Sequence, residues 1–247
     1  MTRPDVKIAA SLAGFAEAAA LYVTELACKT IRDRGMFAIA LAGGETPRGI
    51  YRLLESGSMK GRIDWSRVHV FFGDERMVPP DDPQSNYGMV RAELIRRVPI
   101  PGKNVHRILG ERHVDEAVHL YADELRHFFE DDAPRFDLTV LGVGVEGHVA
   151  SLFPGTDALK EMVKSVTSSY VPDLKSWRVS LTLPVINTSR QILFLVSGKS
   201  KASIVRTVLT STTPSFDIPA SLVRPADGHL HWILDSEAGA LLPVEMR

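Results

Sequence analysis

Hydrophobic and polar positions follow two patterns that alternate along the chain. Ser11 is a suitable N-cap for a helix over 12–34, where apolar residues fall on one face and Gly35 provides a stop. The continuous apolar run 36–42 then predicts a strand buried on both faces. The alternation continues, with strands expected at 68–74, 136–143, 178–184, 191–198 and 229–235, and helices at about 46–56, 85–97, 114–130 and 200–210. Strands that alternate with helices indicate an α/β fold with a mostly parallel sheet and helices on both faces.

The amino-acid composition is consistent with this predicted α/β fold. The 247 residues carry a net charge of −1, with 45% hydrophobic and 24% charged residues, as in an ordinary globular protein. We expect a single domain over 1–247 and no affinity for nucleic acid or membranes. The sequence MTRPDVKIAA at 1–10 has no apolar signal core and no apolar run approaches a membrane span, so a cytoplasmic enzyme is expected. Cys28 is expected to be a buried hydrophobe. Residues 155–177 form the least regular region.

Four polar loops follow predicted strands. They are GGETP at 43–47, GDERMVP at 73–79, GVGVEGH at 142–148 and GKSKA at 198–202. The carboxyl ends of parallel strands share one edge of the sheet, and ligands of such folds bind there. We therefore expect the four loops to form one site.

The loop 142–148 has the spacing Gly142-x-Gly144-x-x-Gly147 of a dinucleotide-binding turn. Such a turn needs a long helix after it and an acidic residue about 20 positions on, at the end of the next strand. Here Pro154 follows soon after the glycines, and no strand precedes Glu161. The sequence therefore argues against a nicotinamide cofactor, and the glycines are better explained by close backbone approach to an anion or substrate.

Two features of 43–47 suit a phosphate. Gly43 and Gly44 follow a buried strand, with Thr46 expected as N-cap and Pro47 as the first helical residue. Backbone N–H groups at such a helix start bind phosphates well. A tight, well-capped turn without a ligand explains the same residues equally.

Two cations are further candidates for phosphate binding. Arg76 follows a strand and can hold a phosphate with two parallel hydrogen bonds, or it can pair with Asp74 or Glu75. Lys199 opens a predicted helix, where a cation is locally unfavourable unless an anion is bound. The alternative for Lys199 is a solvated surface side chain.

His148 is the candidate general base, with Glu146 close by in sequence. Imidazole can take a proton from water near neutral pH, whereas the alternative role is a packed histidine bonded to backbone. The other histidines show no trusted zinc-ligand spacing, and no G-x-S-x-G elbow occurs. Neither a metal nor an organic cofactor is expected.

At these residues the chain resembles the 6-phosphogluconolactonase family. The resemblance rests on LAGGETP at 41–47, the block 70–89, GVGVEGHVASLFPGT at 142–156, and the segments 180–187, 197–202 and 219–223. It implies a Rossmann-like fold and hydrolysis of 6-phospho-D-glucono-1,5-lactone. It also implies His148 as the base that activates water, and phosphate binding by Arg76, Lys199 and the loop around Thr46. Backbone N–H groups of the Gly142–Gly147 loop are a hypothetical contact for the oxyanion.

The resemblance has two departures and leaves alternatives. Glu146 stands where the family usually has Asp, and Glu45 stands where it usually has Ser. A glucosamine-6-phosphate deaminase or sugar-phosphate isomerase is the alternative within the fold, although HVASLFPG lacks the Phe-Asn-Glu of the deaminase loop. A non-catalytic sugar-phosphate-binding regulator is the other, but its usual DNA-binding extension is not expected before Ser11. The expected partner is a small sugar-phosphate lactone, and the expected state a monomer, with a weak dimer as the alternative.

Overall fold

A six-stranded sheet forms the centre of the computed structural model, which describes residues 4–130, 133–172 and 175–246. All pairings in this sheet are parallel, and the strand order is β1-β9-β8-β5-β2-β3. The strands are β1 Asp5–Ala9, β2 Phe37–Leu41, β3 Val68–Phe72, β5 Leu138–Leu141, β8 Gln191–Val196 and β9 His229–Asp235. Every residue of β2 and β5 is buried, as expected of central strands covered on both faces.

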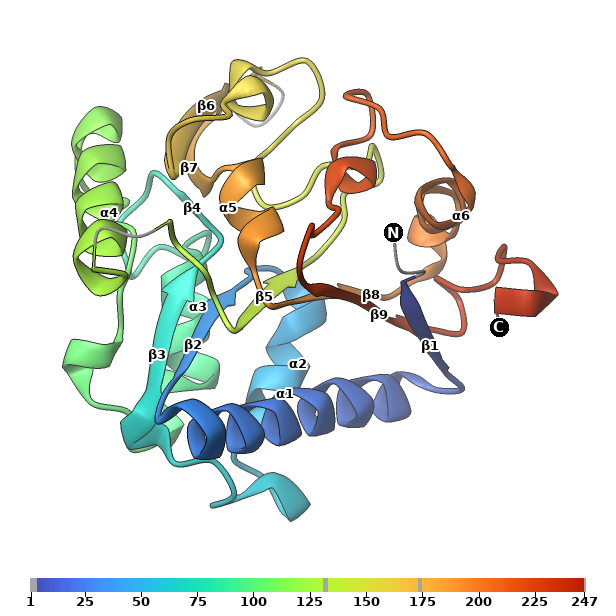
Figure 1. Ribbon diagram of the computed structural model, residues 1–247, viewed down its shortest axis with the longest axis horizontal. Helices are drawn as coiled ribbons and strands as arrows, with labels where there is room; N and C mark the ends of the chain where they lie inside the picture. The colour runs from blue at the N-terminus through green and yellow to red at the C-terminus, as the bar shows by residue number, and fades with distance from the viewer. Residues whose placement is uncertain (1–3, 131–132, 173–174, 247) are drawn as a thin grey trace.

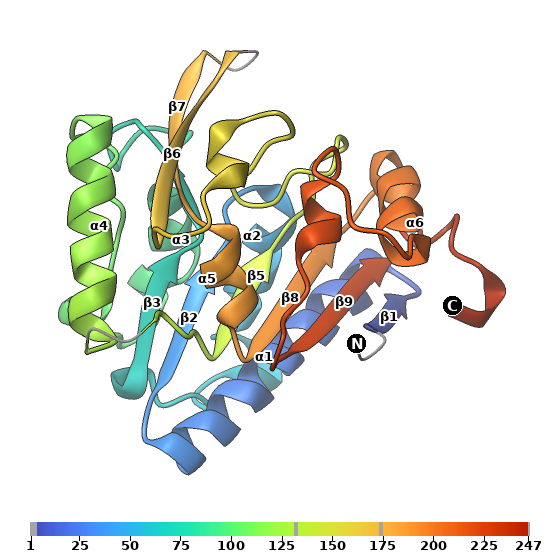
Figure 2. The same cartoon turned by 45° about the horizontal axis from the view of Figure 1, so that its top comes forward.

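Helices cover both faces of this sheet (Figures 1 and 2), with α1 and α2 on one face and α5 and α6 on the other. The α-helices are α1 Leu12–Arg34, α2 Glu45–Leu53, α3 Asn86–Glu93, α4 Val114–Phe128, α5 Leu183–Thr188 and α6 Ala202–Thr210. The short 3-10 helices are η1 Gly57–Met59, η2 Trp65–Arg67, η3 Ile95–Arg97, η4 Gly102–Asn104, η5 Asp157–Lys160, η7 Lys199–Lys201, η8 Pro219–Leu222 and η9 Val244–Met246. The predicted α/β architecture is confirmed.

A second, smaller sheet lies above the carboxyl edge of the first. It is antiparallel, has the order β4-β7-β6, and consists of β4 Asp74–Arg76, β6 Val166–Val171 and β7 Ser176–Leu181. The hairpin of β6 and β7 projects from the molecule in Figure 2. This sheet was not predicted: the run 68–74 divides at Gly73 between the two sheets, and residues 178–181 belong to the second one.

Other local predictions can be compared directly with the structure. Ser11 caps α1, since its side chain accepts a hydrogen bond from the Gly14 N–H, and Gly35 ends the helix with a φ of 84°. Strand β1 was missed. The region 155–177 is more regular than expected, because it contains η5 and β6, although residues 173 and 174 lie outside the described part.

The strand order fixes where a ligand can enter. From β2 the chain continues to β3 on one side, whereas from β5 it continues to β8 and β9 on the other. Strands β2 and β5 are neighbours, and the loops that follow them run in opposite directions from their carboxyl ends. This position, where the direction of the strand order reverses, is called a topological switch point. It leaves a crevice between the two loops, which is the usual ligand site in this class of sheet. In the described ranges, no helix has the length and apolar character needed to cross a membrane.

Candidate active site

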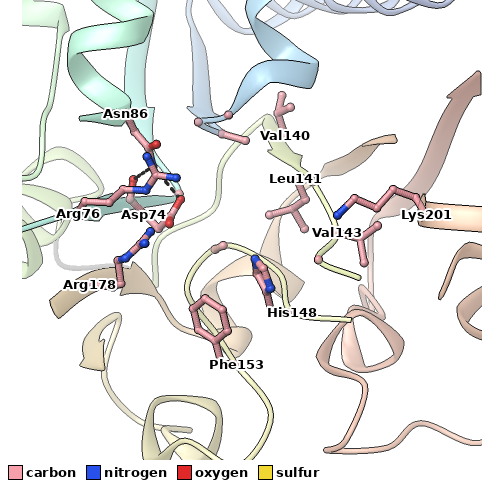
Figure 3. Close-up of a pocket in the computed structure, with 17 residues that line it drawn as sticks. Asp74, Arg76, Asn86, Val140, Leu141, Val143, His148, Phe153, Arg178 and Lys201 are labelled. Carbon is pink, nitrogen blue, oxygen red and sulfur yellow. Dashed lines mark hydrogen bonds between the residues drawn. The ribbon is translucent and has the colours of Figure 1, made fainter. Parts of the chain in front are cut away.

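A cavity of about 270 Å³ occupies the switch point between β2 and β5. Its floor is formed by the loop after β2 and by residues 140–144. The second sheet contributes Arg76 and Arg178 on one side, and Lys201 lies on the opposite side, with His148 between them (Figure 3). Three of the four predicted loops therefore line one cavity through Gly43, Arg76 and His148, and the fourth contributes Lys201.

The glycine loop is shaped around His148. A Cβ atom on Gly144 would lie 2.0 Å from Nδ1 of His148 and 2.7 Å from Oε2 of Glu146, so only glycine fits there. Gly147 has a φ of +92°, which favours glycine as well. No α-helix follows the loop within the described residues up to Thr156, as predicted. The glycines thus make room for an imidazole and its carboxylate partner.

Backbone hydrogen bonds close this loop. The Gly144 N–H donates to the carbonyl of His148 at 2.9 Å, and the Gly147 N–H donates to the carbonyl of Gly144 at 3.0 Å. Both N–H groups are therefore engaged inside the loop. These two N–H groups are therefore not available to an oxyanion, although Gly144 itself lines the cavity, and the hypothesis stays open for the other N–H groups of the Gly142–Gly147 loop.

His148 and Glu146 form a hydrogen-bonded pair, with Nδ1 and Oε1 2.7 Å apart. A carboxylate partner fixes the tautomer, because Nδ1 then carries the proton and Nε2 keeps its lone pair. Phe153 stacks on the ring at a centroid distance of 4.2 Å and limits its rotation. The His148 side chain is 28% exposed, which is compatible with contact to water.

Two opposing effects act on the carboxyl group of Glu146. Partial burial raises its pKa, whereas its own backbone N–H, His148 and Lys201 lower it, and the net pKa lies below the usual value. Glu146 is therefore ionised at neutral pH and can accept the Nδ1 proton of His148 in a hydrogen bond. We call His148, Glu146 and Lys201 the imidazole end of the cavity.

Lys201, rather than Lys199, lines the cavity. Both belong to the three-residue helix η7, but Lys199 is exposed, and its backbone N–H donates to Glu237 at 3.2 Å. Burial lowers the pKa of Lys201, an effect that nearby Glu146 opposes. The sequence argument for a cation after β8 therefore identified the right segment, but the lysine facing the cavity is two residues further on.

The opposite end of the cavity concentrates positive charge. Arg76 of β4 and Arg178 of β7 are register partners in the second sheet. Arg178 is only 7% exposed; burial and the charge of Arg76 lower its pKa, the charges of Asp74 and Glu75 oppose this effect, and the guanidinium remains protonated. Like charges directly opposite each other on a sheet are destabilising unless something compensates them.

Several polar atoms at this end have no partner. The Nε atoms of Arg76 and Arg178 and the Oδ1 atom of Asn86 are buried without a hydrogen bond. Buried polar atoms are normally paired, so three unpaired atoms in residues that line one cavity set this end apart from the imidazole end. The guanidinium of Arg76 donates to the Gln84 carbonyl and, among the ion pairs described, has none with Asp74 or Glu75. We call Arg76, Arg178 and Asn86 the arginine end.

Gly43 and Gly44 border the arginine end. The Asn86 side chain packs so closely on Gly43 that a Cβ atom there would lie 1.7 Å from its Oδ1. Helix α2 begins at Glu45 with Gly44 as N-cap and without a side-chain cap. Thr46 is therefore not the N-cap that the sequence suggested; its hydroxyl is 3.1 Å from Ser197 Oγ.

Buried carboxylates hold the two ends in place. Asp74 accepts hydrogen bonds from Asn86 at 3.1 Å and from the Ser151 hydroxyl at 2.6 Å, which ties the arginine end to the chain after His148. Glu75 accepts bonds from the backbone N–H groups of Asn86 and Tyr87 and from Ser85 at the start of α3. Burial raises the pKa of Glu75, and these bonds oppose that effect.

Sequence reasoning missed Arg178, Lys201, Asn86 and Phe153. A single charged residue in the otherwise uncharged stretch 176–189 was an available signal for Arg178. The other three became recognisable only when the fold brought their segments together. Across the described ranges, no group of three or more His, Cys, Asp or Glu side chains is arranged to hold a metal ion.

Comparisons with known proteins agree with this geometry. Residues 10–232 match the family model of glucosamine-6-phosphate isomerases and 6-phosphogluconolactonase. The chain is 39% identical over 229 residues to the 6-phosphogluconolactonase of Homo sapiens, covering 92% of this chain and 88% of that protein. It is 35% identical to the 6-phosphogluconolactonase of Synechocystis sp., covering 96% and 97% of the two chains.

Solved structures are similar along nearly the whole chain. The 6-phosphogluconolactonase of Thermotoga maritima superposes with a TM-score of 0.81 at 30% identity, covering 94% of this chain and 100% of the other. The enzyme of the same name from Trypanosoma cruzi gives a TM-score of 0.86 at 28% identity and covers 97% of both chains. A monomeric glucosamine-6-phosphate deaminase, at 22% identity and a TM-score of 0.77, shares the fold.

Proposed function

The chain belongs to the family of glucosamine-6-phosphate isomerases and 6-phosphogluconolactonases, and we propose that it hydrolyses 6-phosphogluconolactone to 6-phosphogluconate. The observation that carries this proposal is one cavity with a histidine–carboxylate pair at one end and two opposed arginines at the other. The first can activate water, and the second can hold a phosphate. The lactonase relatives, which match over most of their length, support the same reaction.

His148 is the general base in this proposal. Its Nε2 accepts a proton from water while the water oxygen attacks the lactone carbonyl, and Glu146 stabilises the imidazolium that forms. The tetrahedral intermediate then collapses, the bond from the carbonyl carbon to the ring oxygen breaks, and the imidazolium returns its proton to that oxygen. The product is one open chain with a free hydroxyl group and a carboxylic acid, which releases its remaining proton to solvent and becomes a carboxylate.

The substrate phosphate is proposed to bind at the arginine end. Arg76 and Arg178 line the cavity and would each donate from the guanidinium group, and the uncapped start of α2 at Gly44 adds a favourable dipole. An anion here also relieves the repulsion between the two cross-strand arginines. Anchoring at this end fixes the distant carbonyl against the water at His148.

Lys201 is proposed to stabilise negative charge on the carbonyl oxygen. It lies on the side of the cavity opposite the arginines (Figure 3), and the loop N–H groups of Gly144 and Gly147 are already engaged. A cation close to the reacting carbonyl lowers the energy of the tetrahedral intermediate. Lys199 and Thr46, which the sequence favoured, receive no direct contact with substrate in this arrangement.

Further expectations accompany this function. We propose that residues 1–247 form one domain and that the enzyme works in the cytoplasm as a monomer on a small sugar-phosphate lactone. Light scattering at working concentration is expected to give the mass of one 27.2 kDa chain. A stable dimer at that concentration would contradict the monomer.

The activity can be tested with purified protein and lactone generated in situ. Hydrolysis to 6-phosphogluconate is expected to exceed the spontaneous rate without added metal or nucleotide, and to be faster for the phosphorylated lactone than for gluconolactone. Glucosamine 6-phosphate serves as the competing substrate, since deaminases share this fold. Release of ammonia from it, with lactone hydrolysis at the spontaneous rate, would overturn the proposal.

A further inference from the structure

Two histidines that the proposed mechanism does not use lie side by side at the edge of the main sheet. His69 belongs to the edge strand β3, and His106 lies on the segment after η4, where its backbone N–H donates to the Val70 carbonyl at 2.8 Å. Nδ1 of His69 is 3.1 Å from Nε2 of His106, and Nδ1 of His106 is 2.5 Å from Oε1 of Glu124 on α4. We call His69, His106 and Glu124 the histidine row, because they form one line of hydrogen bonds from β3 to α4.

Aromatic rings enclose the middle of this row. The side chain of His106 is 8% exposed and stacks on Phe71 at a centroid distance of 4.2 Å with an interplanar angle of 6°. Phe128 of α4 packs edge-on against the same ring at 5.2 Å. A polar ring in such a site needs its hydrogen bonds, since a buried polar group without a partner is costly. Glu124 is 46% exposed and His69 is half-buried, so protons from solvent can reach both ends of the row.

The hydrogen bonds fix the tautomers while both rings are neutral. An ionised carboxylate only accepts, so the proton of His106 lies on Nδ1, which faces Glu124. Nε2 of His106 then has a lone pair and no proton, so it can only accept. His69 must therefore donate to it from Nδ1, and both neutral rings are Nδ1–H tautomers.

The row can take up one further proton without losing a hydrogen bond. That proton binds Nε2 of His69, and the proton on Nδ1 of His69 passes to Nε2 of His106. His106 is then an imidazolium that donates to Glu124 on one side and to Nδ1 of His69 on the other. A second added proton leaves two positively charged rings with N–H groups facing each other across 3.1 Å, so this contact cannot persist.

We propose that the histidine row is an acid-sensitive link between α4 and the sheet, which keeps its hydrogen bonds with one added proton and breaks when both rings are charged. The surroundings of His69 support this: burial and the charges of His106 and of Lys103 on η4 lower its pKa. The other elements around His69 bring no titratable group, since β2 pairs Ala38 with it and α4 presents the Phe128 ring.

The sign of the effect on stability follows from this lowered pKa. Histidines of the unfolded chain titrate near about pH 6.5, so below that pH the unfolded chain binds more protons than the folded protein. The row therefore stabilises the fold fully above about pH 6.5, and this contribution is lost as the pH falls below that value.

A second link between α4 and β3 does not depend on acid. The Tyr121 hydroxyl donates to the Phe72 carbonyl at 2.8 Å and accepts from the Phe72 N–H at 3.0 Å, and burial raises the pKa of this tyrosine. Helix α4, which lies beside β3 in Figures 1 and 2, also packs against β6 and β7. Breaking the histidine row therefore weakens the support of the second sheet while α4 stays attached.

The first test is proton–nitrogen correlation NMR of the wild-type protein, titrated from about pH 9 to about pH 5. The signal of His69 is assigned by its absence in His69→Asn. We expect His69 as the Nδ1–H tautomer as long as His106 is neutral, and as the Nε2–H tautomer once His106 is charged. An Nε2–H tautomer of His69 beside a neutral His106 would overturn the proposal, and so would two charged rings that remain in contact.

The second test compares the melting temperature at about pH 7.5 and about pH 5. Asparagine at position 69 can donate to or accept from Nε2 of His106 but carries no charge. The fall in melting temperature is expected to be about 2–4 °C smaller in His69→Asn than in the wild type, the size typical of one interaction in a chain of this length. His113→Asn, whose side chain is 74% exposed, should keep the wild-type fall. Equal falls in His69→Asn and the wild type would overturn the proposal, and neither test depends on lactone hydrolysis.

Discussion

The two ends of the active-site cavity differ in how their polar groups are paired. At the imidazole end the groups are paired with each other: His148 bonds to Glu146, and Lys201 lies close enough to lower the pKa of that carboxylate. At the arginine end, the Nε atoms of Arg76 and Arg178 are buried without partners. One end pairs a carboxylate with an imidazole within the protein, and the other places two guanidinium groups opposite each other.

In the proposed mechanism, this difference follows from the role of each end. A general base must be held in one tautomer before the substrate arrives, so its partner belongs to the protein. A phosphate site must instead leave its donors vacant, at a cost in repulsion that binding recovers. Asp74 connects the two ends through Asn86 and Ser151, so the spacing between phosphate and base is built into the fold.

The largest effect is expected for His148→Asn. Asparagine keeps a polar side chain but cannot take a proton at neutral pH, so kcat should fall about 10²- to 10⁴-fold. His113→Asn, an exposed histidine in the described structure, is the matched control and should keep wild-type activity. Single-turnover kinetics beside thermal melting separates catalysis from folding. A stable variant with near wild-type kcat would remove His148 from the mechanism.

Gly144→Ala tests the imidazole end without replacing a titratable residue. The added Cβ atom collides with Nδ1 of His148, so the imidazole must move, and a displacement of about 1 Å costs about 10²-fold in kcat. Gly102→Ala is the control, because its Cβ atom would meet no atom within 4 Å and Gly102 does not line the cavity. Equal kcat values for both variants would show that the position of the imidazole does not limit the reaction.

Arg76→Ala and Arg178→Met test the arginine end. Each loses a charge-assisted contact worth about 1.5–3 kcal/mol, or about 10- to 150-fold in kcat/KM. The preference for phosphorylated lactone over gluconolactone should shrink in parallel, whereas Arg206→Ala, an exposed arginine of α6, should change neither. Unchanged preference in both variants would mean that the phosphate binds elsewhere.

The main sheet could be predicted because its signals are local. Ser11 and Gly35 delimit α1 by capping, and the apolar run that became β2 is buried on both faces. Strand β1 was missed because DVKIA at the sheet edge alternates exposed and half-buried residues and gives no apolar run. The second sheet was missed because a hydrophobic pattern does not encode which strands pair, and Gly73 redirects the chain inside one continuous run.

The candidate site shows the same difference between features that the local sequence predicts and features that depend on tertiary structure. The sequence identified the loops, His148, Glu146 and Arg76, because strand ends and residue chemistry are readable locally. Arg178 depends on the pairing of β4 with β7, which is a tertiary event. The difference between Lys199 and Lys201 depends on the direction in which a three-residue helix turns its side chains, and no periodic pattern that short can fix it.

The variants Lys201→Gln and Lys199→Gln test which of the two lysines contributes to the reaction. Lys201 lines the cavity near Glu146, so its loss should lower kcat/KM about 10-fold, close to the contribution of one charged contact. Lys199 is exposed outside the cavity, so its loss should have no measurable effect. Steady-state kinetics on folded proteins decides between them. A larger loss of kcat/KM in Lys199→Gln than in Lys201→Gln would show that Lys199, the lysine that the sequence favoured, is the one that contributes.

The smallest effect concerns pH and the affinity for the product. Burial lowers the pKa of Lys201 below its ordinary value of about 10.4, so its positive charge is present at neutral pH and is lost earlier than usual as the pH rises. The phosphate stays dianionic above about pH 7 and the arginines stay charged, so neither obscures the transition. Calorimetric affinity for 6-phosphogluconate should therefore fall a few-fold as the pH approaches 10.

Lys201→Arg is the control for this titration, because a guanidinium keeps its charge over the whole range. The fall in affinity should disappear in this variant and persist in Lys199→Arg. If Lys201→Arg still loses affinity with the wild-type profile, another group titrates in the cavity. The two ends would then differ less than their hydrogen bonds indicate, since the charge that the imidazole end contributes to product binding would not come from Lys201.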